Sequence, residues 1–306
     1  MGGIAIYAGV LVALLIAMPF SEWVKLKYFF IGTSLMFFIG LRDDILGLTP
    51  IKKLIGQLLP ILIIVIFGKL SFGSSILGIP SISFPGWVIF LLVISAFVLT
   101  TNAYNLIDGL DGLAGVTGVI VLSFFGLWFF FAGESYLSLI ALSVVGSILA
   151  FLKFNWQPSK IFMGDTGALL IGFIISFFAI TFLEVNENIG DDFNIPFSSS
   201  IGTLCCVLII PVFDTSRVVI FRLRKGLSPF KADRNHIHHQ FLKLGYNHAQ
   251  SVVRIGAINI AFVVLAILLR KQSDLVLIPL VVVLCLLINF ALKWRQKNAG
   301  TNTKAV

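Results

Sequence analysis

The acidic residues of this 306-residue chain are concentrated in a few short segments between apolar runs. Asp43 and Asp44 are adjacent, although like charges repel and capping a helix needs only one carboxylate. Four oxygen-bearing side chains follow further along at steps of three: Asn102, Asn105, Asp108 and Asp111. This spacing places side chains on one face of a helical turn. Hard oxygen donors without cysteine favour Mg²⁺, with Mn²⁺ as an alternative, bound together with substrate phosphate oxygens.

A further carboxylate, Asp165, stands between two glycines just before an apolar run that begins near residue 168. The free N–H groups and the positive dipole end at a helix start favour a phosphate there. Capping alone is the alternative for Asp165, as it is for Asp111 before the run near residue 114. Phe162 could stack on a base, and its alternative is packing against lipid or core.

Three histidines, His236, His238 and His239, follow a basic segment that contains Arg234. Imidazole and guanidinium groups donate hydrogen bonds to anionic oxygens. A zinc site is a weaker alternative because no cysteine accompanies the histidines. A solvated loop drawn to anionic lipid headgroups is another. We favour anion binding, and a metal, a diphosphate and aspartates together indicate phosphoryl transfer.

The composition requires a membrane to surround these groups. Of all residues, 58% are hydrophobic and 12% are charged, and the mean hydropathy is +1.03. Soluble domains have about 25% charged residues, so a soluble globular protein is excluded. Nucleic-acid binders carry their positive charge on a polar, solvated scaffold, whereas this chain, with a net charge of +8, is mostly apolar. We therefore expect the lipid bilayer and no nucleic acid as a partner.

Apolar runs of roughly the length that spans a bilayer, about 17 to 25 residues, divide the chain. They cover approximately residues 4–19, 26–41, 54–68, 87–104, 114–133, 136–153, 168–185, 198–213, 251–269 and 274–292. We predict an all-α, polytopic helical bundle of about ten transmembrane helices, with residues 1–306 as one domain. The polar connections that carry chemistry are approximately 42–53, 102–113, 154–167 and 214–250, and residues 293–306 form a tail.

The basic residues predict the orientation of this bundle. With ten crossings, 17 of the 22 Lys and Arg residues fall on one side, together with both termini. The positive-inside rule places that side in the cytoplasm. The polar connections with the aspartates and all four histidines lie on the same side, so we predict an active site on the cytoplasmic face.

Taken in order, four motifs resemble the polyprenyl-phosphate N-acetylhexosamine-1-phosphate transferase family over nearly the whole chain. They are Arg42-Asp43-Asp44, the segment 102–115, Phe162-Met-Gly-Asp165-Thr-Gly, and Ser228 through His239. The His-Ile-His-His form is similar to the branch that uses UDP-N-acetylglucosamine, more than to the muramoyl-pentapeptide branch.

The resemblance implies that the phosphate of undecaprenyl phosphate attacks the β-phosphorus of a UDP-N-acetylhexosamine and releases UMP, in a bacterial cytoplasmic membrane. It implies Mg²⁺ at Asn105 and Asp165, and the lipid phosphate at Asp43 and Asp44. The implied nucleotide, sugar and diphosphate contacts are Asp108, Asp111, Asn102, Asn155, Phe162, His236, His238 and His239, to which we add Arg234 on grounds of charge. The sugar and the oligomeric state, with a homodimer as one option, stay open.

Relatives of this kind begin with an additional helix and a basic loop that ends in Gly-Gly, whereas this sequence begins Met1-Gly2-Gly3. We expect the natural start to lie upstream. A transporter or flippase for an anionic solute is the alternative function, disfavoured because the helix interiors lack charge and the halves show no repeat. A non-catalytic scaffold leaves the clustered aspartates unexplained.

Overall fold

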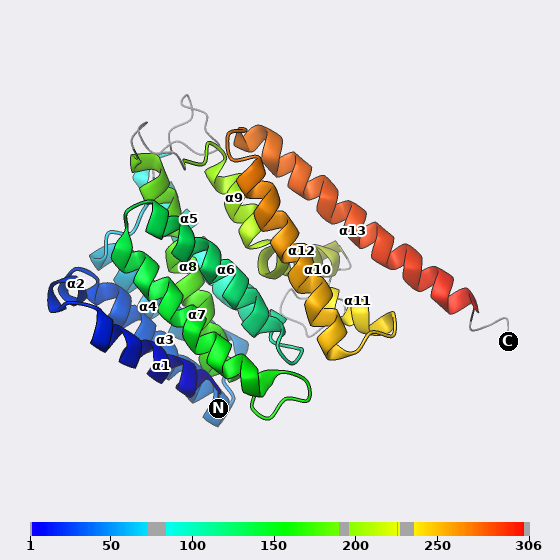
Figure 1. Cartoon of the computed structure of the whole chain (residues 1–306), viewed down its shortest axis with the longest axis horizontal. Helices are drawn as coiled ribbons and strands as arrows, with labels where there is room; N and C mark the ends of the chain where they lie inside the picture. The colour runs from blue at the N-terminus through cyan, green and yellow to red at the C-terminus, as the bar shows by residue number, and fades with distance from the viewer. Residues whose placement is uncertain (1, 73–83, 190–195, 225, 227–235, 303–306) are drawn as a thin grey trace.

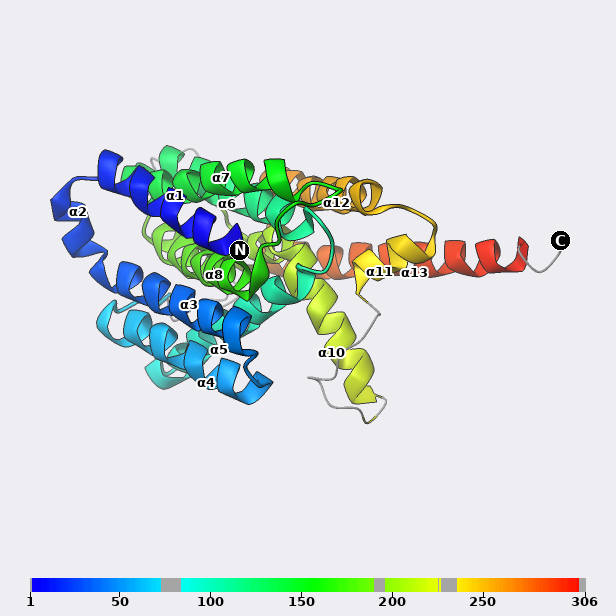
Figure 2. The same cartoon turned by 90° about the horizontal axis from the view of Figure 1, so that it is seen from below.

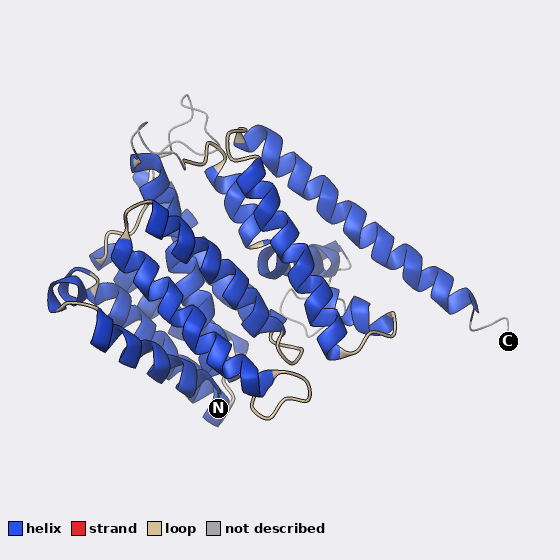
Figure 3. Cartoon of the chain, in the orientation of Figure 1, coloured by secondary structure: helices blue, strands red, loops and turns tan. Residues whose placement is uncertain are grey.

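The computed structural model describes residues 2–72, 84–189, 196–224, 226 and 236–302, and every regular element within them is a helix (Figures 1 and 3). The α-helices are α1 Gly2–Ala17, α2 Phe20–Lys25, α3 Lys27–Leu46, α4 Pro50–Leu62, α5 Gly86–Ile107, α6 Leu113–Phe131, α7 Ser135–Asn155, α8 Gly164–Asn188, α9 Ser200–Val207, α10 Asp214–Arg224, α11 Ile237–Lys243, α12 His248–Leu268 and α13 Asp274–Asn302. Two short π-helical segments, η1 Ile63–Phe67 and η2 Ile209–Phe213, continue α4 and precede α10.

Helix α8 is the centre of the bundle. Every residue from Thr166 to Phe182 is buried, and α8 packs against α1, α3, α5, α6 and α9. A helix that is apolar on all sides is expected inside a larger assembly of helices. In Figure 2, α8 lies between α1, α6 and α7 on one side and α3, α4 and α5 on the other, and α13 extends away from the rest. The first turn of α8 is therefore within reach of several neighbouring helices.

Two glycines allow close approach to α8. A Cβ on Gly40 of α3 would lie 2.6 Å from the Cα of Thr166. A Cβ on Gly172 of α8 would lie 2.9 Å from the Cα of Thr101 in α5. Small residues at such positions bring membrane helices into backbone contact. The ends of α3 and α5, which carry the predicted site residues, are thereby brought to the start of α8.

The protein is a polytopic membrane helical bundle. Seven of the described helices are long and apolar enough to cross a bilayer, and the bent pair of α9 and η2–α10 would be an eighth. All ten predicted apolar runs coincide with helices. Two of the ten runs are not among these eight spans. They correspond to α1, which has 16 residues, and to α3, whose last turns contain the charged residues Arg42-Asp43-Asp44.

The predicted run 198–213 is not one straight helix. Helix α9 ends at Val207, and the chain resumes as η2 and α10 at an angle of 79°. Pro211 lies in η2 and lacks a backbone N–H, and proline and π-helical turns are common causes of sharp kinks. The bend directs η2 and α10 away from the axis of α9 (Figure 1), and Asp214 is the first residue of α10 after η2.

Four connections meet at one end of the bundle, which we call the motif end: residues 47–49, 108–112, 156–163 and 244–247. Hydrogen bonds join them across the chain. The Gly112 N–H donates to Asn155 Oδ1 at 2.8 Å, and the Ala249 N–H donates to Gln157 Oε1 at 2.8 Å. These two bonds connect the start of α6 to the end of α7, and the loop after α7 to the start of α12.

Candidate active site

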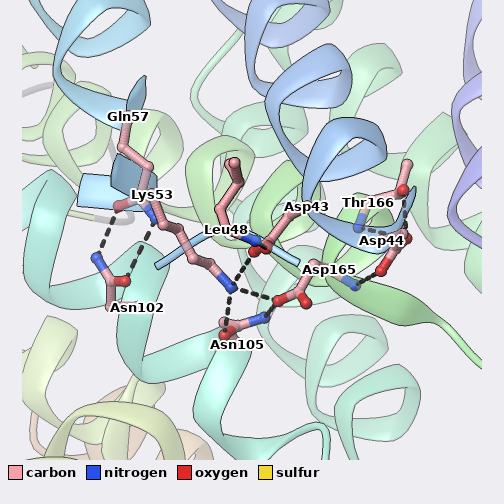
Figure 4. Close-up of polar contacts among 9 residues, drawn as sticks. All are labelled: Asp43, Asp44, Leu48, Lys53, Gln57, Asn102, Asn105, Asp165 and Thr166. Carbon is pink, nitrogen blue, oxygen red and sulfur yellow. Dashed lines mark hydrogen bonds and ion pairs between the residues drawn. The ribbon is translucent and has the colours of Figure 1, made fainter. Parts of the chain in front are cut away.

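An acidic cluster at the motif end is formed by α3, α4, α5 and α8 (Figure 4). Its central group is the ammonium of Lys53, one turn into α4. Lys53 Nζ lies 2.9 Å from Asp43 Oδ2, donates to Asn105 Oδ1 at 3.1 Å and forms an ion pair with Asp165 Oδ1. The Asn105 amide also donates to Asp165 Oδ1 at 2.6 Å. The predicted proximity of Asp43, Asn105 and Asp165 is thus found in the structure.

These groups differ in their access to solvent. The Asp43 side chain is 6% exposed, Lys53 is 15% exposed and Asp165 is 34% exposed. Asp43 is further held by the Leu48 N–H, which donates to Oδ1 at 2.7 Å. Of the two carboxylates that pair with Lys53, Asp165 therefore has more room for a ligand.

Asp44 binds the start of α8 rather than Lys53. Its carboxylate accepts from the N–H of Asp165 at 2.8 Å, from the N–H of Thr166 at 3.1 Å and from the Thr166 hydroxyl. A carboxylate at a helix N-terminus satisfies free N–H groups and complements the dipole. The capping that was considered for Asp165 is thus performed by Asp44 from another helix, and the Asp165 side chain is left for the cluster.

Asn102 lies one turn before Asn105 and is held by a residue of α4. Its amide donates to Gln57 Oε1 at 2.7 Å, and the Gln57 amide donates back to Asn102 Oδ1 at 3.3 Å. Gln57 is fully buried. This reciprocal pair fixes α4 against α5 and so sets the position of Lys53 relative to Asn105.

The expectation that four residues share one helical face is wrong for Asp108 and Asp111. Helix α5 ends at Ile107, and both aspartates lie in the turn before α6. Gly112 has φ +83°, a conformation that glycine adopts without strain, and it precedes α6 without a side-chain cap. Asp111 therefore does not cap α6, and its Oδ2 lies 3.4 Å from His248 Nδ1.

Burial raises the pKa of Asp108 to about 7, and the negative charges of Asp165, Asp44 and Asp111 add to this effect. A carboxyl group with that pKa exchanges its proton near neutral pH. The charge of Asp108 is thus sensitive to pH near neutrality and to a nearby cation.

Two residues predicted for nucleotide binding occupy different surroundings. Asn155 is buried and connects two loops, since Oδ1 accepts from Gly112 and its amide donates to the Ile161 carbonyl at 2.8 Å. Phe162 is 68% exposed at the motif end. A ring with that exposure is available for stacking, whereas Asn155 holds the loop that presents it.

The histidines lie on the other side of the Asp108 turn. His236 Nδ1 lies 2.9 Å from Asp214 Oδ2, and both side chains are buried. The rings of His236 and His238 are parallel, with centroids 5.6 Å apart, and the His239 ring is 4.3 Å from that of His238. Burial and the neighbouring histidines lower the pKa of His238 to about 4, so this ring is neutral at physiological pH.

Some predicted groups lie outside the described residues, and others were missed. Arg234 and the basic segment before His236 are not among the described residues. Lys53, Gln57 and Asp214 were not predicted as site residues. Lys53 was visible only as one of two adjacent lysines that contribute to the charge asymmetry. A buried amide such as Gln57, in the helix after the acidic pair, leaves no sequence signal of its own.

The donor set of the acidic cluster fits a magnesium ion. Carboxylate and amide oxygens of Asp165 and Asn105 converge on one cationic group, the Lys53 ammonium. Among the described residues, no group of three or more His, Cys, Asp and Glu side chains is arranged to hold a metal. Two protein oxygens with substrate phosphate oxygens are typical of Mg²⁺, which rarely has a complete protein cage.

Comparison with known proteins gives the family. Residues 26–183 match the model of glycosyl transferase family 4. The chain belongs to glycosyl transferase family 4. The family match ends within α8 and includes the acidic cluster, the Asp108 turn and Phe162. The member described here is thus a phosphoglycosyltransferase by family.

Relatives in this family extend the similarity over most of the chain. A "Probable undecaprenyl-phosphate N-acetylglucosaminyl 1-phosphate transferase" of Bacillus subtilis is 33% identical over 277 residues, which cover 89% of this chain and 74% of the relative. A "Decaprenyl-phosphate N-acetylglucosaminephosphotransferase" of Mycolicibacterium smegmatis is 31% identical, with 83% and 68% covered. The Escherichia coli K12 "Undecaprenyl-phosphate alpha-N-acetylglucosaminyl 1-phosphate transferase" is 28% identical, with the same coverage.

Proposed function

We propose that this protein transfers N-acetylglucosamine 1-phosphate from UDP-N-acetylglucosamine to undecaprenyl phosphate. The products are UMP and a lipid-linked diphosphate sugar, which would begin the synthesis of a cell-envelope polysaccharide. The observation that carries the proposal is the acidic cluster around Lys53, placed within a family 4 chain whose relatives are named for this reaction.

In the reaction, an oxygen of the lipid phosphate forms a bond to the β-phosphorus of the nucleotide sugar. The bond from that phosphorus to the α–β bridging oxygen breaks, and UMP leaves with the electron pair. A phosphate monoester has a second pKa near 6 and is largely ionised at pH 7. A strong base is therefore unnecessary, and positioning and charge neutralisation carry the catalysis.

The residues of the acidic cluster divide this work. Asp165 and Asn105 would hold Mg²⁺, which supplies positive charge to the diphosphate oxygens when it is bound. Lys53 adds a fixed positive charge beside them, 2.9 Å from Asp43. We propose that the lipid phosphate binds next to Asp43 and Asp44. Their negative charge orients Lys53 and the N-terminus of α8 at that position.

Nucleotide binding is proposed for the neighbouring loops. Phe162 would stack on uracil because it is exposed at the motif end, and Asn155 would hold its loop. Asp108 and Asp111 would line the nucleotide pocket. His236, His238 and His239 would contact the diphosphate or the sugar.

An apolar cavity of about 260 Å³ supports a lipid substrate. It lies between α5, α8 and α9 and is lined by residues that include Leu92, Thr100, Ile180 and Leu204. The helices α5 and α8 that line it also carry Asn105 and Asp165 at their motif ends. A prenyl chain in this cavity would extend along the same two helices that hold the reacting phosphate.

We also propose the finer topology. Ten crossings, with α1 and α3 completed by their flanking residues, would place the motif end and residues 293–306 in the bacterial cytoplasm. This orientation agrees with the bias of Lys and Arg toward one side. The whole chain would then act as one transmembrane domain.

The test is UMP release by purified protein in nanodiscs with undecaprenyl phosphate, Mg²⁺ and a panel of UDP-sugars. We expect release with UDP-N-acetylglucosamine and its loss in excess EDTA. Faster release with another UDP-2-acetamido sugar or with UDP-muramoyl-pentapeptide would contradict the sugar assignment. Absence of release with every donor, together with movement of an anionic solute across the membrane, would favour the transporter.

A further inference from the structure

Asp214 is a buried carboxylate at the junction of η2 and α10, and it contacts three partners among the described residues. Its Oδ2 lies 2.9 Å from His236 Nδ1. Its Oδ1 accepts from the Ile237 N–H at 2.9 Å and from Arg217 at 2.8 Å. Arg217 in turn donates to Asn289 of α13 at 2.9 Å. One aspartate therefore connects α10, α11 and α13.

The chemistry of these contacts fixes the state of His236. An ionised carboxylate only accepts hydrogen bonds, so the facing Nδ1 must carry a proton. Burial of both side chains excludes water from this contact. The ring geometry then directs Nε2 to the side opposite Asp214. In functional histidines, a carboxylate that bonds one ring nitrogen commonly fixes the tautomer and the orientation of the ring in this way.

The parallel rings connect this pair to the acidic half of the site. His238 lies against Gly109, where a Cβ would come within 2.9 Å of His238 Nε2. Gly109 directly follows Asp108. The His238 ring thus lies between His236 and the Asp108 turn, and the planes of the His236 and His238 rings are 4° apart.

We propose that Asp214 is a positioning residue for His236, an inference that rests on the proposed transferase function. Its carboxylate fixes the ring through Nδ1–H. When Nε2 takes a proton opposite an anionic phosphate oxygen of the nucleotide diphosphate, the charge of Asp214 balances the imidazolium. His236 then presents a fixed, charge-assisted donor to the substrate.

The first test is the protonation of His236 in the wild-type protein, which does not depend on activity. Protein with ¹⁵N-labelled imidazoles is measured by NMR at a pH roughly two units above the ordinary histidine pKa of about 6.5, and His236→Gln identifies the signal. A proton on Nδ1, with Nε2 bare or protonated, supports the pair. A neutral ring with its proton on Nε2 alone would overturn the proposal, even where Asp214→Asn failed to fold.

The second test uses Asp214→Asn, because the asparagine amide can donate to Nδ1 and removes the negative charge. We expect loss of the Nδ1–H form and a fall in kcat of about 10- to 100-fold, the range found when a carboxylate orienting a metal-bound histidine is removed. Asp214→Glu should recover part of kcat. Unchanged protonation and unchanged kcat in Asp214→Asn would contradict the proposal.

A matched control separates positioning from packing. Asp274 is 1% exposed and accepts from the Gly202 N–H at 2.7 Å, at the end of the bundle opposite the motif end. We expect Asp274→Asn to retain wild-type kcat. In a His236→Gln background, Asp214→Asn should cause no further loss of kcat, whereas an equal additional loss would show that Asp214 acts only on the fold. Absent UMP release by the wild type would count against the transferase, while the NMR result would still decide the pair.

Discussion

The acidic cluster and the histidine segment lie on two sides of the Asp108 turn and are built in different ways. Four helices contribute side chains to the acidic cluster, and these side chains bond directly to one another around Lys53. The histidines come from one short helix and the residue before it, and a single aspartate holds the leading ring. Close helix packing therefore determines the geometry of the first region, and one buried hydrogen bond determines that of the second.

The two regions also differ in charge. Beside the acidic cluster, burial raises the pKa of Asp108 to about 7, and the negative charges of Asp165, Asp44 and Asp111 add to this effect. In the histidine segment, burial lowers the pKa of His238 to about 4. The first region thus attracts a cation, whereas the second can contact anionic oxygens without surplus negative charge. A metal–diphosphate substrate has the complementary distribution.

The largest effect is expected from Asp165→Asn, which removes the most accessible carboxylate of the acidic cluster. We expect UMP release to fall by more than about 1,000-fold, because this carboxylate is the proposed metal ligand. Binding of Mn²⁺, followed by electron paramagnetic resonance, should weaken in parallel. Glu134→Gln, an exposed acid-to-amide change beyond the other end of α6, should leave both unchanged. Full activity of Asp165→Asn would remove the basis for the metal site.

Lys53→Met should have the next largest effect. It leaves Asp43 and Asp165 without their shared cation and removes a fixed positive charge near the diphosphate. We expect roughly a 100-fold loss of kcat and a lower unfolding temperature, because a buried carboxylate loses its partner. Lys52→Met is the matched control, since Lys52 is the exposed neighbour on the same helix. Equal behaviour of the two variants would exclude a special role for Lys53.

Phe162→Leu should affect substrate binding more than catalysis. Stacking on a base contributes about 1 to 3 kcal/mol, so we expect the KM for the UDP-sugar to rise by roughly 10-fold with kcat nearly constant. Phe154→Leu changes another exposed aromatic side chain near the end of α7 and should leave KM unchanged. A fall in kcat that is larger than the rise in KM would contradict stacking as the role of Phe162.

Asp108→Asn should have a small effect on stability that depends on pH. Because the pKa of Asp108 is raised in the folded protein, its contribution to stability falls as pH rises from about 4 to about 7. The variant should unfold above the wild type at pH 8, by roughly 2 to 4 °C for each 1 kcal/mol of the lost contribution, and at the same temperature near pH 4. Glu134→Gln should show no such dependence. If the variant and the wild type unfold at the same temperature both at pH 8 and near pH 4, the pKa of Asp108 is not raised in the folded protein.

Much of this arrangement could be predicted from the sequence because its causes are local. The apolar runs predict the helices, and the adjacency of Asp43 and Asp44 indicates that the pair does more than cap its own helix. The spacing of Asn102 and Asn105 also holds, since both lie on α5. Their common face could not extend to Asp108 and Asp111, because α5 ends at Ile107 and a glycine-containing turn follows.

The remaining features depend on contacts between distant segments. Lys53 became the centre of the cluster only because Gln57 and Asn102 fix α4 against α5. Asp44 reaches the start of α8 only because Gly40 allows α3 to approach it. Asp214 adjoins an apolar run, and it bonds His236 from the first residue of α10, in the segment that follows the bend after Val207. None of these contacts is encoded by spacing within one segment.

In the proposed reaction, the β-phosphorus of the nucleotide sugar is transferred to the lipid. Its most direct test follows ³²P from UDP-N-acetylglucosamine labelled at either the α or the β position, with undecaprenyl phosphate and Mg²⁺. We expect the β-label to enter the organic-soluble lipid and the α-label to be recovered in UMP, in equal amounts. Recovery of both labels in aqueous UDP would contradict transfer of the β-phosphorus. So would the absence of both labelled lipid and labelled UMP.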